Sequence, residues 1–135
     1  MALERNELGI KGFPNWCQGC GDYGIWVALK NAIKEIGLQP NEYLMVAGIG
    51  CSGKLPQWMN AYGFHSLHGR PVPLAAGFRL ANNKLPVFIA GGDGDGYGEG
   101  LGHMLHAARR NLDIVYIVHN NQIYGLTTGQ YSPTS

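Results

Sequence analysis

Two segments decide the fold of this chain: residues 85–95, LPVFIAGGDGD, and residues 114–121, IVYIVHNN. Each is an apolar run that ends in polar residues, and the residues between the two runs have helical periodicity. This order predicts a strand–helix–strand unit. Ligands of open α/β sheets bind at the carboxyl ends of the strands. Because carboxylate and amide oxygens at such an edge suit Mg²⁺ bound together with substrate phosphates, we expect a Mg²⁺-diphosphate site there.

The polar residues at the two strand ends have distinct expected roles. Asp93 can supply a hard oxygen ligand, and a side-chain carbonyl from Asn120 or Asn121 can complete the cation shell. The backbone N–H groups of residues 94–96 can cradle phosphate oxygens near a helix N-terminus. A Gly-Asp-Gly turn alone is weak evidence, because turns use both residue types constantly. Paired with Asn-Asn across one unit, it becomes a specific signal.

The composition limits the possible partners. The chain has 135 residues, enough for one domain with a core, and shows neither an internal repeat nor a linker, so we expect a single domain over 1–135. Only 14% of the residues are charged, against about 25% in typical domains, so we expect much of the surface to be covered in an oligomer. A net charge of +1 does not indicate the basic surface that binds nucleic acid or a membrane.

The distribution of apolar residues along the sequence predicts the compartment. We find no apolar run that approaches the ~20 residues of a membrane span. The first residues, MALER, form no apolar h-region, so we expect no signal peptide and a cytoplasmic location.

Alternating helical and strand patterns predict an α/β fold, a mostly parallel sheet with helices on both faces. Asp22 is a plausible N-cap for a helix that ends near Ile36, and Gly37 suits its C-terminal stop. The expected elements also include strands at 43–47, 85–90 and 113–118, helices at 56–62, 73–82 and 98–110, and loops at 63–72 and from 120 onward. Three glycines in the last helix (Gly98, Gly100, Gly102) each cost up to ~1 kcal/mol against Ala, so something must approach that helix closely.

The cysteines indicate a metal or redox centre. Cys17 and Cys20 form a C-x-x-C motif, and Cys51 lies in a Gly-rich turn over residues 48–53. Zinc sites, iron–sulfur sites and thioredoxin-like redox pairs all use the C-x-x-C spacing. The redox pair fits poorly, because such a motif usually follows a strand directly. Three thiolates are one short of a four-cysteine site.

The turn after the first strand imitates two nucleotide-binding motifs. Its pattern G-x-G-x-x-G is that of a dinucleotide-binding turn, which needs an acidic residue about 20 positions later. None occurs between Glu42 and Asp93. The same turn followed by Lys54 imitates a P-loop, but Leu55 stands where that motif needs Ser or Thr. Both readings are therefore rejected.

Taken together, the motifs resemble the β subunit of 2-oxoacid:ferredoxin oxidoreductases. The GDG and Asn-Asn pair looks like the thiamine diphosphate motif of thiamine-dependent enzymes. Four further segments follow in the order of that family: WCQGCG (16–21), GIGCSGK (48–54), HSLHGR (65–70) and YGLTTGQYSPT (124–134). The resemblance spans about residues 13–134 and implies a partial thiamine diphosphate-binding fold.

The resemblance implies three cofactors: thiamine diphosphate, Mg²⁺ and one [4Fe–4S] cluster. It places Mg²⁺ on Asp93, Asn121 and the main-chain carbonyl of Ile123. It places the cluster on Cys17, Cys20 and Cys51, with the family's fourth cysteine further along than Ser135, so the chain looks like the N-terminal half of such a subunit. The implied cofactor-binding residues are Gly50, Cys51, Ser52, Gly53, His68, Gly92, Asp93, Gly94, Asp95, Asn121, Tyr124, Gly125, Leu126 and Thr127.

The resemblance also implies candidate catalytic residues. Lys54 would lie beside the cofactor and could bind the substrate carboxylate, although a solvated surface charge is an equal alternative. His65 and His68 could steady a developing oxyanion, or they could be ligands or loop fillers. His103 and His106, on the last helix, are more readily explained as structural residues.

The implied function is oxidative decarboxylation of a 2-oxoacid, 2-oxoglutarate or a broad range, to acyl-CoA and CO₂, with electrons passing to ferredoxin. The expected partners are ferredoxin, coenzyme A, the 2-oxoacid and an α subunit in a heterodimer. The α subunit would supply the glutamate that activates the cofactor, because no Glu here fits that motif. Two alternatives stay open: a non-redox thiamine diphosphate decarboxylase or ligase, and a zinc-stabilised binding module.

Overall fold

The computed structural model describes residues 12–135, so the expected absence of a signal peptide concerns residues outside the described part. None of the helices in residues 12–135 has both the length and the apolar character needed to cross a membrane. In chain order the elements are α1 (Gly21–Ile36), β1 (Leu44–Ala47), η1 (Ser52–Trp58), β2 (Tyr62–His65), α2 (Pro71–Ala81), β3 (Val87–Gly92), η2 (Gly94–Glu99), α3 (Leu101–Arg109), β4 (Val115–His119), β5 (Ile123–Tyr124) and β6 (Gln130–Tyr131).

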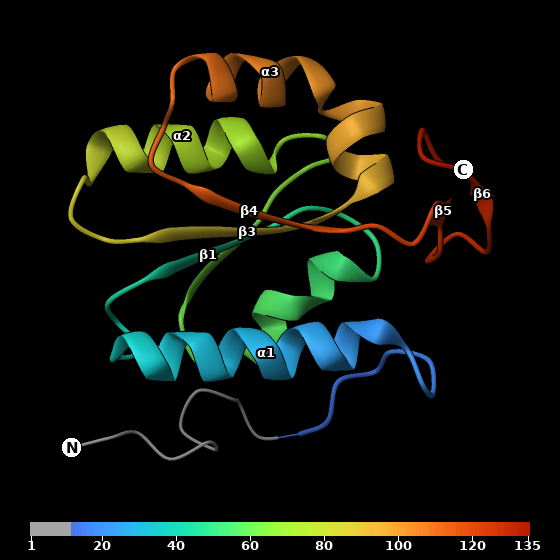
Figure 1. The fold of residues 1–135 in the computed structure, drawn as a ribbon, viewed down its shortest axis with the longest axis horizontal. Helices are drawn as coiled ribbons and strands as arrows, with labels where there is room; N and C mark the ends of the chain where they lie inside the picture. Colours follow the sequence, from blue (N-terminus) through green and yellow to red (C-terminus); the bar gives the residue numbers. More distant parts are fainter. Residues whose placement is uncertain (1–11) are drawn as a thin grey trace.

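Four strands form one parallel sheet in the order β2-β1-β3-β4. Figure 1 shows α1 and η1 on one face of this sheet and α2 and α3 on the other, which confirms the predicted fold class. After β1 the chain first adds β2 on one side and then β3 on the other. This reversal makes a switch point between β1 and β3, where ligands of open α/β sheets bind.

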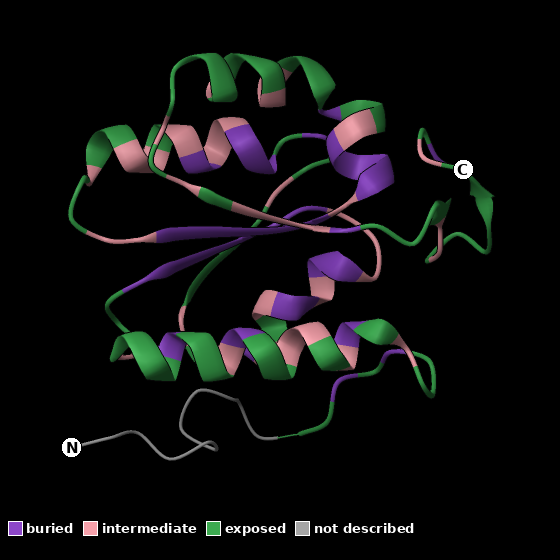
Figure 2. Cartoon of the chain, viewed as in Figure 1, coloured by how far each residue is buried: buried purple, intermediate pink, exposed green. Residues whose placement is uncertain are grey.

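Strand alternation divides the interior into two cores. Met45 of β1 and Tyr43 directly before it face the α1 side, and Leu44 and Val46 face the α2 side. On β3 the same alternation holds, because successive side chains of a strand point to opposite faces. Both strands are therefore buried along their length, as Figure 2 shows. A parallel sheet covered on both faces needs such continuous apolar strands.

The first helix confirms one predicted end and corrects the other. Gly37 adopts a φ of 83° and its N–H bonds the carbonyl oxygens of Ile33 and Lys34, so it ends α1 as expected. Asp22 is not the N-cap, because α1 begins at Gly21 and Cys20 occupies the cap position. The Asp22 side chain instead turns toward the sheet and pairs with a histidine of β4.

Other predicted boundaries also need correction. The loop expected at 63–72 begins as strand β2, whose residues are all exposed, so backbone pairing with β1 rather than an apolar pattern specifies it. The helix expected at 56–62 is a 3-10 segment that starts earlier, at Ser52. The helix expected at 98–110 is preceded by the π-helical turn η2. The tail expected as loop contains the short antiparallel pair β5 and β6.

Close approach explains two of the three glycines around the start of α3. A Cβ on Gly98 would lie 2.6 Å from the Tyr124 hydroxyl, and a Cβ on Gly100 would lie 2.9 Å from the Gly69 carbonyl oxygen. At Gly102, apart from its chain neighbours and the adjacent helix backbone, no heavy atom of the described chain lies within 4 Å of the added carbon, and nothing in the structure explains that glycine.

Tyr43 allows a test of the core through alkaline titration. The side chain is fully buried, its hydroxyl donates to the Asn60 carbonyl oxygen at 3.2 Å, and burial raises its pKa from 10.0 to about 12. The phenolate is therefore disfavoured in the folded state. The contribution of Tyr43 to stability is complete below pH 10 and is lost as the pH rises toward the folded pKa.

We therefore expect Tyr43→Phe to cost about 1 kcal/mol at neutral pH, the value of one hydrogen bond. Above pH 10 the wild-type chain should lose up to about 3 kcal/mol that the variant does not lose. Urea unfolding of both proteins through a pH series measures this difference. A difference in the free energy of unfolding that stays constant from neutral to alkaline pH would contradict the assignment.

Candidate cofactor site

A cavity of about 800 Å³ lies at the carboxyl ends of the four parallel strands. Its wall includes Gly50 after β1, His65 at the end of β2, Gly92 at the end of β3 and His119 at the end of β4. The volume falls within the ~300–1,000 Å³ of typical small-molecule sites. Sheet topology alone therefore brings the separate motifs of the sequence to one place.

Most residues singled out from the sequence line this cavity. They are Cys17, Cys20, Gly50, Cys51, Ser52, Lys54, His65, His68, Gly92, Gly94, Asp95, Asn121, Ile123, Tyr124, Gly125, Leu126 and Thr127. Gly53 and Asp93 do not line it, because both are buried behind its wall. Gly53 allows a tight turn, since a Cβ there would lie 2.4 Å from the Gly48 carbonyl oxygen.

The two carboxylate oxygens of Asp93 lie in different surroundings. Oδ2 accepts hydrogen bonds from the Ser132 hydroxyl and, at 2.6 Å, from the Thr134 hydroxyl. Oδ1 is buried and has no hydrogen-bond partner within residues 12–135. Burial raises the pKa of Asp93, but the two hydroxyls and the backbone N–H groups of Asp93 and Asn121 lower it below the ordinary value. The group is therefore an anion with one uncommitted oxygen, which fits a hard cation.

Asp95 links the GDGD turn to the loop that carries His68. Its Oδ1 accepts a hydrogen bond from the Gly69 backbone N–H at 2.7 Å, and its Oδ2 is buried without a partner in the described part of the chain. Burial raises the pKa of Asp95. Gly48 makes room for this side chain, because a Cβ there would lie 2.2 Å from Oδ2.

Replacing Gly48 tests this packing. We expect Gly48→Ala to displace the Asp95 carboxylate, break its bond to the Gly69 N–H and destabilise the chain by about 1–3 kcal/mol, the range for overpacking. Gly24→Ala is the matched control, because Gly24 lies in α1 and, apart from its own helix backbone and chain neighbours, no heavy atom of residues 12–135 lies within 4 Å of the added carbon. The control should gain up to about 1 kcal/mol from helix propensity. Thermal unfolding that changes equally in both variants would contradict the role given to Gly48.

The three cysteines lie on the same cavity, and none forms a disulfide. The indole N–H of Trp16 donates to the Cys51 carbonyl oxygen at 2.8 Å, which joins the C-x-x-C loop to the second turn. Burial raises the pKa of the Cys51 thiol, while Lys54 opposes that rise. Within residues 12–135, no three His, Cys, Asp or Glu side chains converge closely enough to hold a single metal ion.

Sequence reasoning missed a buried pair on the cavity wall. His119 Nδ1 lies 2.7 Å from Asp22 Oδ1, and both side chains are about nine-tenths buried or more. His119 Nε2 is buried with no hydrogen-bond partner among the described residues. A histidine directly before the Asn pair was the only sequence signal for it.

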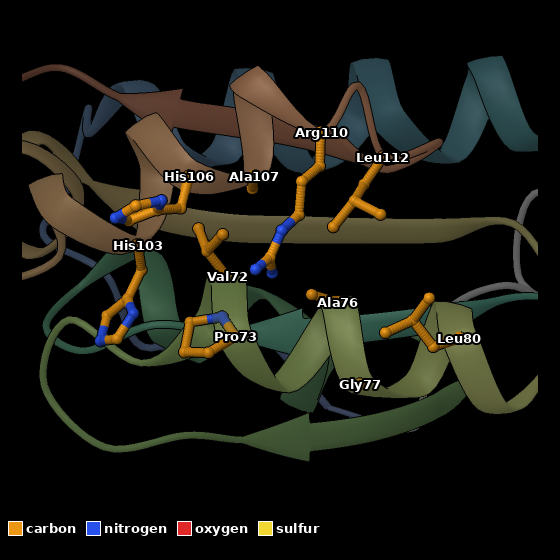
Figure 3. Close-up of a pocket in the computed structure, with 10 residues that line it drawn as sticks. All are labelled: Val72, Pro73, Ala76, Gly77, Leu80, His103, His106, Ala107, Arg110 and Leu112. Atoms are coloured by element: carbon orange, nitrogen blue, oxygen red, sulfur yellow. The ribbon is translucent and has the colours of Figure 1, made fainter.

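A second groove, of about 260 Å³, lies between α2 and α3. Figure 3 shows His103 and His106 at one end of this groove and Leu80 at the other. His103 Nε2 lies 3.1 Å from Arg70 Nη1. Both histidines therefore lie apart from the strand-end cavity.

Residues 44–135 match the family described as thiamine pyrophosphate enzyme, C-terminal TPP binding domain. The chain belongs to this family. The match begins at β1 and includes the GDG turn, the Asn-Asn pair and all four strand ends.

Individual relatives agree with the resemblance inferred from the motifs. The chain is 53% identical over 122 residues to a 2-oxoacid:ferredoxin oxidoreductase subunit beta of Saccharolobus solfataricus, covering 89% of this chain and 40% of that protein. It is 48% identical over 120 residues to the 2-oxoglutarate oxidoreductase subunit KorB of Mycobacterium tuberculosis, covering 89% and 32%. The chain thus spans less than half the length of these relatives.

A solved structure shares the fold. It is a 2-oxoglutarate:ferredoxin oxidoreductase from Magnetococcus marinus with 2-oxoglutarate, coenzyme A and succinyl-CoA bound. The likeness has a TM-score of 0.96 at 42% identity and covers 98% of this chain and 46% of that one. The predicted fold and the resemblance to this group of oxidoreductases are therefore confirmed.

Proposed function

We propose that this TPP-binding domain holds thiamine diphosphate and Mg²⁺ in the β subunit of a 2-oxoacid:ferredoxin oxidoreductase. The observation that carries the proposal is the buried Asp93 carboxylate, which keeps one uncommitted oxygen beside a cavity at the switch point of the sheet. The names of relatives up to 53% identical support the reaction class.

Mg²⁺ would be held by Asp93 Oδ1, the side-chain carbonyl of Asn121 and the main-chain carbonyl of Ile123. Asn121 and Ile123 both line the cavity, and the Asn121 N–H faces the Asp93 carboxyl group. All three donors are oxygens, which is the chemistry that Mg²⁺ prefers, and substrate phosphates usually complete its shell.

Thiamine diphosphate, when bound, would supply the nucleophilic and electron-accepting chemistry needed to decarboxylate a 2-oxoacid. This chain's part would be binding and orientation. The turn over residues 92–95 would hold the diphosphate, together with residues 50–53 and 124–127. All of these except Gly53 and Asp93 line the cavity. Lys54, His65 and His68 also line the cavity, where they would bind the substrate carboxylate and stabilise negative charge on the substrate oxygen.

Cys17, Cys20 and Cys51 would bind three corners of a [4Fe–4S] cluster, with the fourth ligand coming from outside this chain. All three cysteines line the cavity, and the Trp16 indole joins the C-x-x-C loop to the turn of Cys51, which supports this proposal. Thiolates are the usual ligands of such clusters.

The substrates and partners follow from the same proposal. The substrate would be 2-oxoglutarate or a broader range of 2-oxoacids, with coenzyme A and ferredoxin as co-substrates and a cytoplasmic location. An α subunit would complete the site. Exposed apolar side chains around the cavity rim and on the adjacent edge strand support a covered surface there: Tyr62, Phe64, Leu67 and Leu126.

Asp93→Ala tests the proposed cofactor site. Removing the only carboxylate of the proposed metal shell should abolish Mg²⁺-dependent binding of thiamine diphosphate, measured by calorimetry. Asp113→Ala is the control, because it also removes one negative charge but lies exposed beside Arg79, away from the cavity. Unchanged affinity in Asp93→Ala would refute the site.

Metal content separates the proposal from a zinc-stabilised module. We expect the assembled enzyme, purified without oxygen, to be brown and to contain iron, and Cys51→Ser to lose both colour and iron. A colourless protein with stoichiometric zinc would remove the cluster assignment. A colourless, metal-poor protein that still binds thiamine diphosphate would favour the non-redox decarboxylase or ligase.

A further inference from the structure

We propose that the hydroxyls of Ser132 and Thr134, together with the Asn120 amide, form a clamp. This clamp fixes the Asp93 carboxylate and selects the oxygen that meets Mg²⁺. This inference rests on the proposed function of Asp93. It gives Asn120 a role in the clamp rather than in the metal shell, and it makes all three positioning residues.

The clamp is built from residues far apart in the sequence. The Ser132 hydroxyl donates to Asp93 Oδ2, and the Thr134 hydroxyl lies 2.6 Å from the same oxygen. Thr134 Oγ1 also lies 2.9 Å from Asn120 Oδ1. Ser132 is 8% exposed and Asp93 is fully buried, so water does not compete freely for these bonds.

Two hydroxyl donors on one carboxylate oxygen leave the other oxygen uncommitted. Asp93 Oδ1 has no partner in the described part of the chain, although a buried carboxylate oxygen without a partner is costly. A cation at Oδ1 would offset that cost. Because Oδ2 already receives two charge-assisted hydrogen bonds, the carboxylate cannot rotate to exchange its oxygens without losing both.

Proton counting assigns the role of Asn120. A threonine hydroxyl has one proton but meets two acceptor positions here, Asp93 Oδ2 and the Asn120 amide. The anionic carboxylate is the stronger acceptor and takes that proton. The Asn120 amide is therefore flipped, which exchanges its oxygen and nitrogen, and its Nδ2 donates to Thr134 Oγ1. The Asn121 side-chain oxygen accepts one hydrogen bond, from the Ile123 N–H at 3.2 Å, and keeps its second lone pair for Mg²⁺.

The test is a calorimetric titration of Mg²⁺ at saturating thiamine diphosphate, on the assembled enzyme stripped of metal. Ser132→Ala and the isosteric Thr134→Val should each weaken Mg²⁺ binding 10- to 100-fold, the usual effect of losing a partner of a metal ligand. Ser132→Thr and Thr134→Ser keep the hydroxyl and should restore near wild-type affinity. Asn120→Ala should weaken binding less than Asn121→Ala does.

Ser135→Ala is the matched control within the same segment. The Ser135 hydroxyl donates to the Gln122 carbonyl oxygen, accepts from the Ser132 backbone N–H at 2.8 Å and lies 3.4 Å from the Ser132 hydroxyl oxygen. It therefore docks the segment but makes no bond to Asp93. If Ser135→Ala weakens Mg²⁺ binding as much as Thr134→Val, the segment acts only by docking and the clamp is refuted. If Ser132→Ala does not fold, Thr134→Val and Thr134→Ser decide the question alone.

The outcomes separate the clamp from the proposed function. Wild-type affinity in Ser132→Ala and Thr134→Val refutes the clamp and leaves the proposed cofactor site standing. A wild-type enzyme that binds thiamine diphosphate without any dependence on Mg²⁺ overturns both.

Discussion

The buried negative charge of Asp93 is the constraint on which the site depends. A carboxylate at 0% exposure is stable only if its oxygens are compensated. Within residues 12–135, two hydroxyls donate to one oxygen, and the other oxygen has no hydrogen-bond partner. The oxygen of this buried anion that has no hydrogen-bond partner is therefore suited to bind a cation. The parallel sheet places the anion at its switch point.

Glycines around the site give this region its shape. Besides Gly48, which makes room for Asp95, Gly94 faces the Tyr124 ring, and a Cβ there would lie 2.6 Å from it. Likewise, a Cβ on Gly96 would lie 2.4 Å from the Tyr116 hydroxyl oxygen. The high glycine content of the GDGDGYGEG segment therefore reflects the close approach of tyrosine side chains and of backbone atoms to it.

The sheet and the cavity could be predicted because their signals are local and chemical. Continuous apolar runs located β1, β3 and β4, and polar residues at their ends located the cavity wall. β2 could not be predicted, because YGFH is exposed throughout and becomes a strand only by pairing with β1. The prediction that Asp22 is the N-cap was wrong. An Asp at the start of a helix suits capping, but in the structure its side chain pairs with His119 instead.

The clamp residues show the same limit. Ser132 and Thr134 lie 39 and 41 residues from Asp93 in sequence, so no periodicity links them to it. Short polar residues in a tail ordinarily indicate a turn. Their role depends on how the segment after β6 folds back over the end of β3, which only the tertiary structure fixes.

The most direct test of this account is a crystal structure of the assembled enzyme with thiamine diphosphate and Mn²⁺ in place of Mg²⁺. The anomalous signal should place the metal in contact with Asp93 Oδ1, Asn121 and the Ile123 carbonyl oxygen. Asp93 Oδ2 should still accept hydrogen bonds from the Ser132 and Thr134 hydroxyls. A metal bound to Oδ2, to Asn120 or away from Asp93 would contradict it.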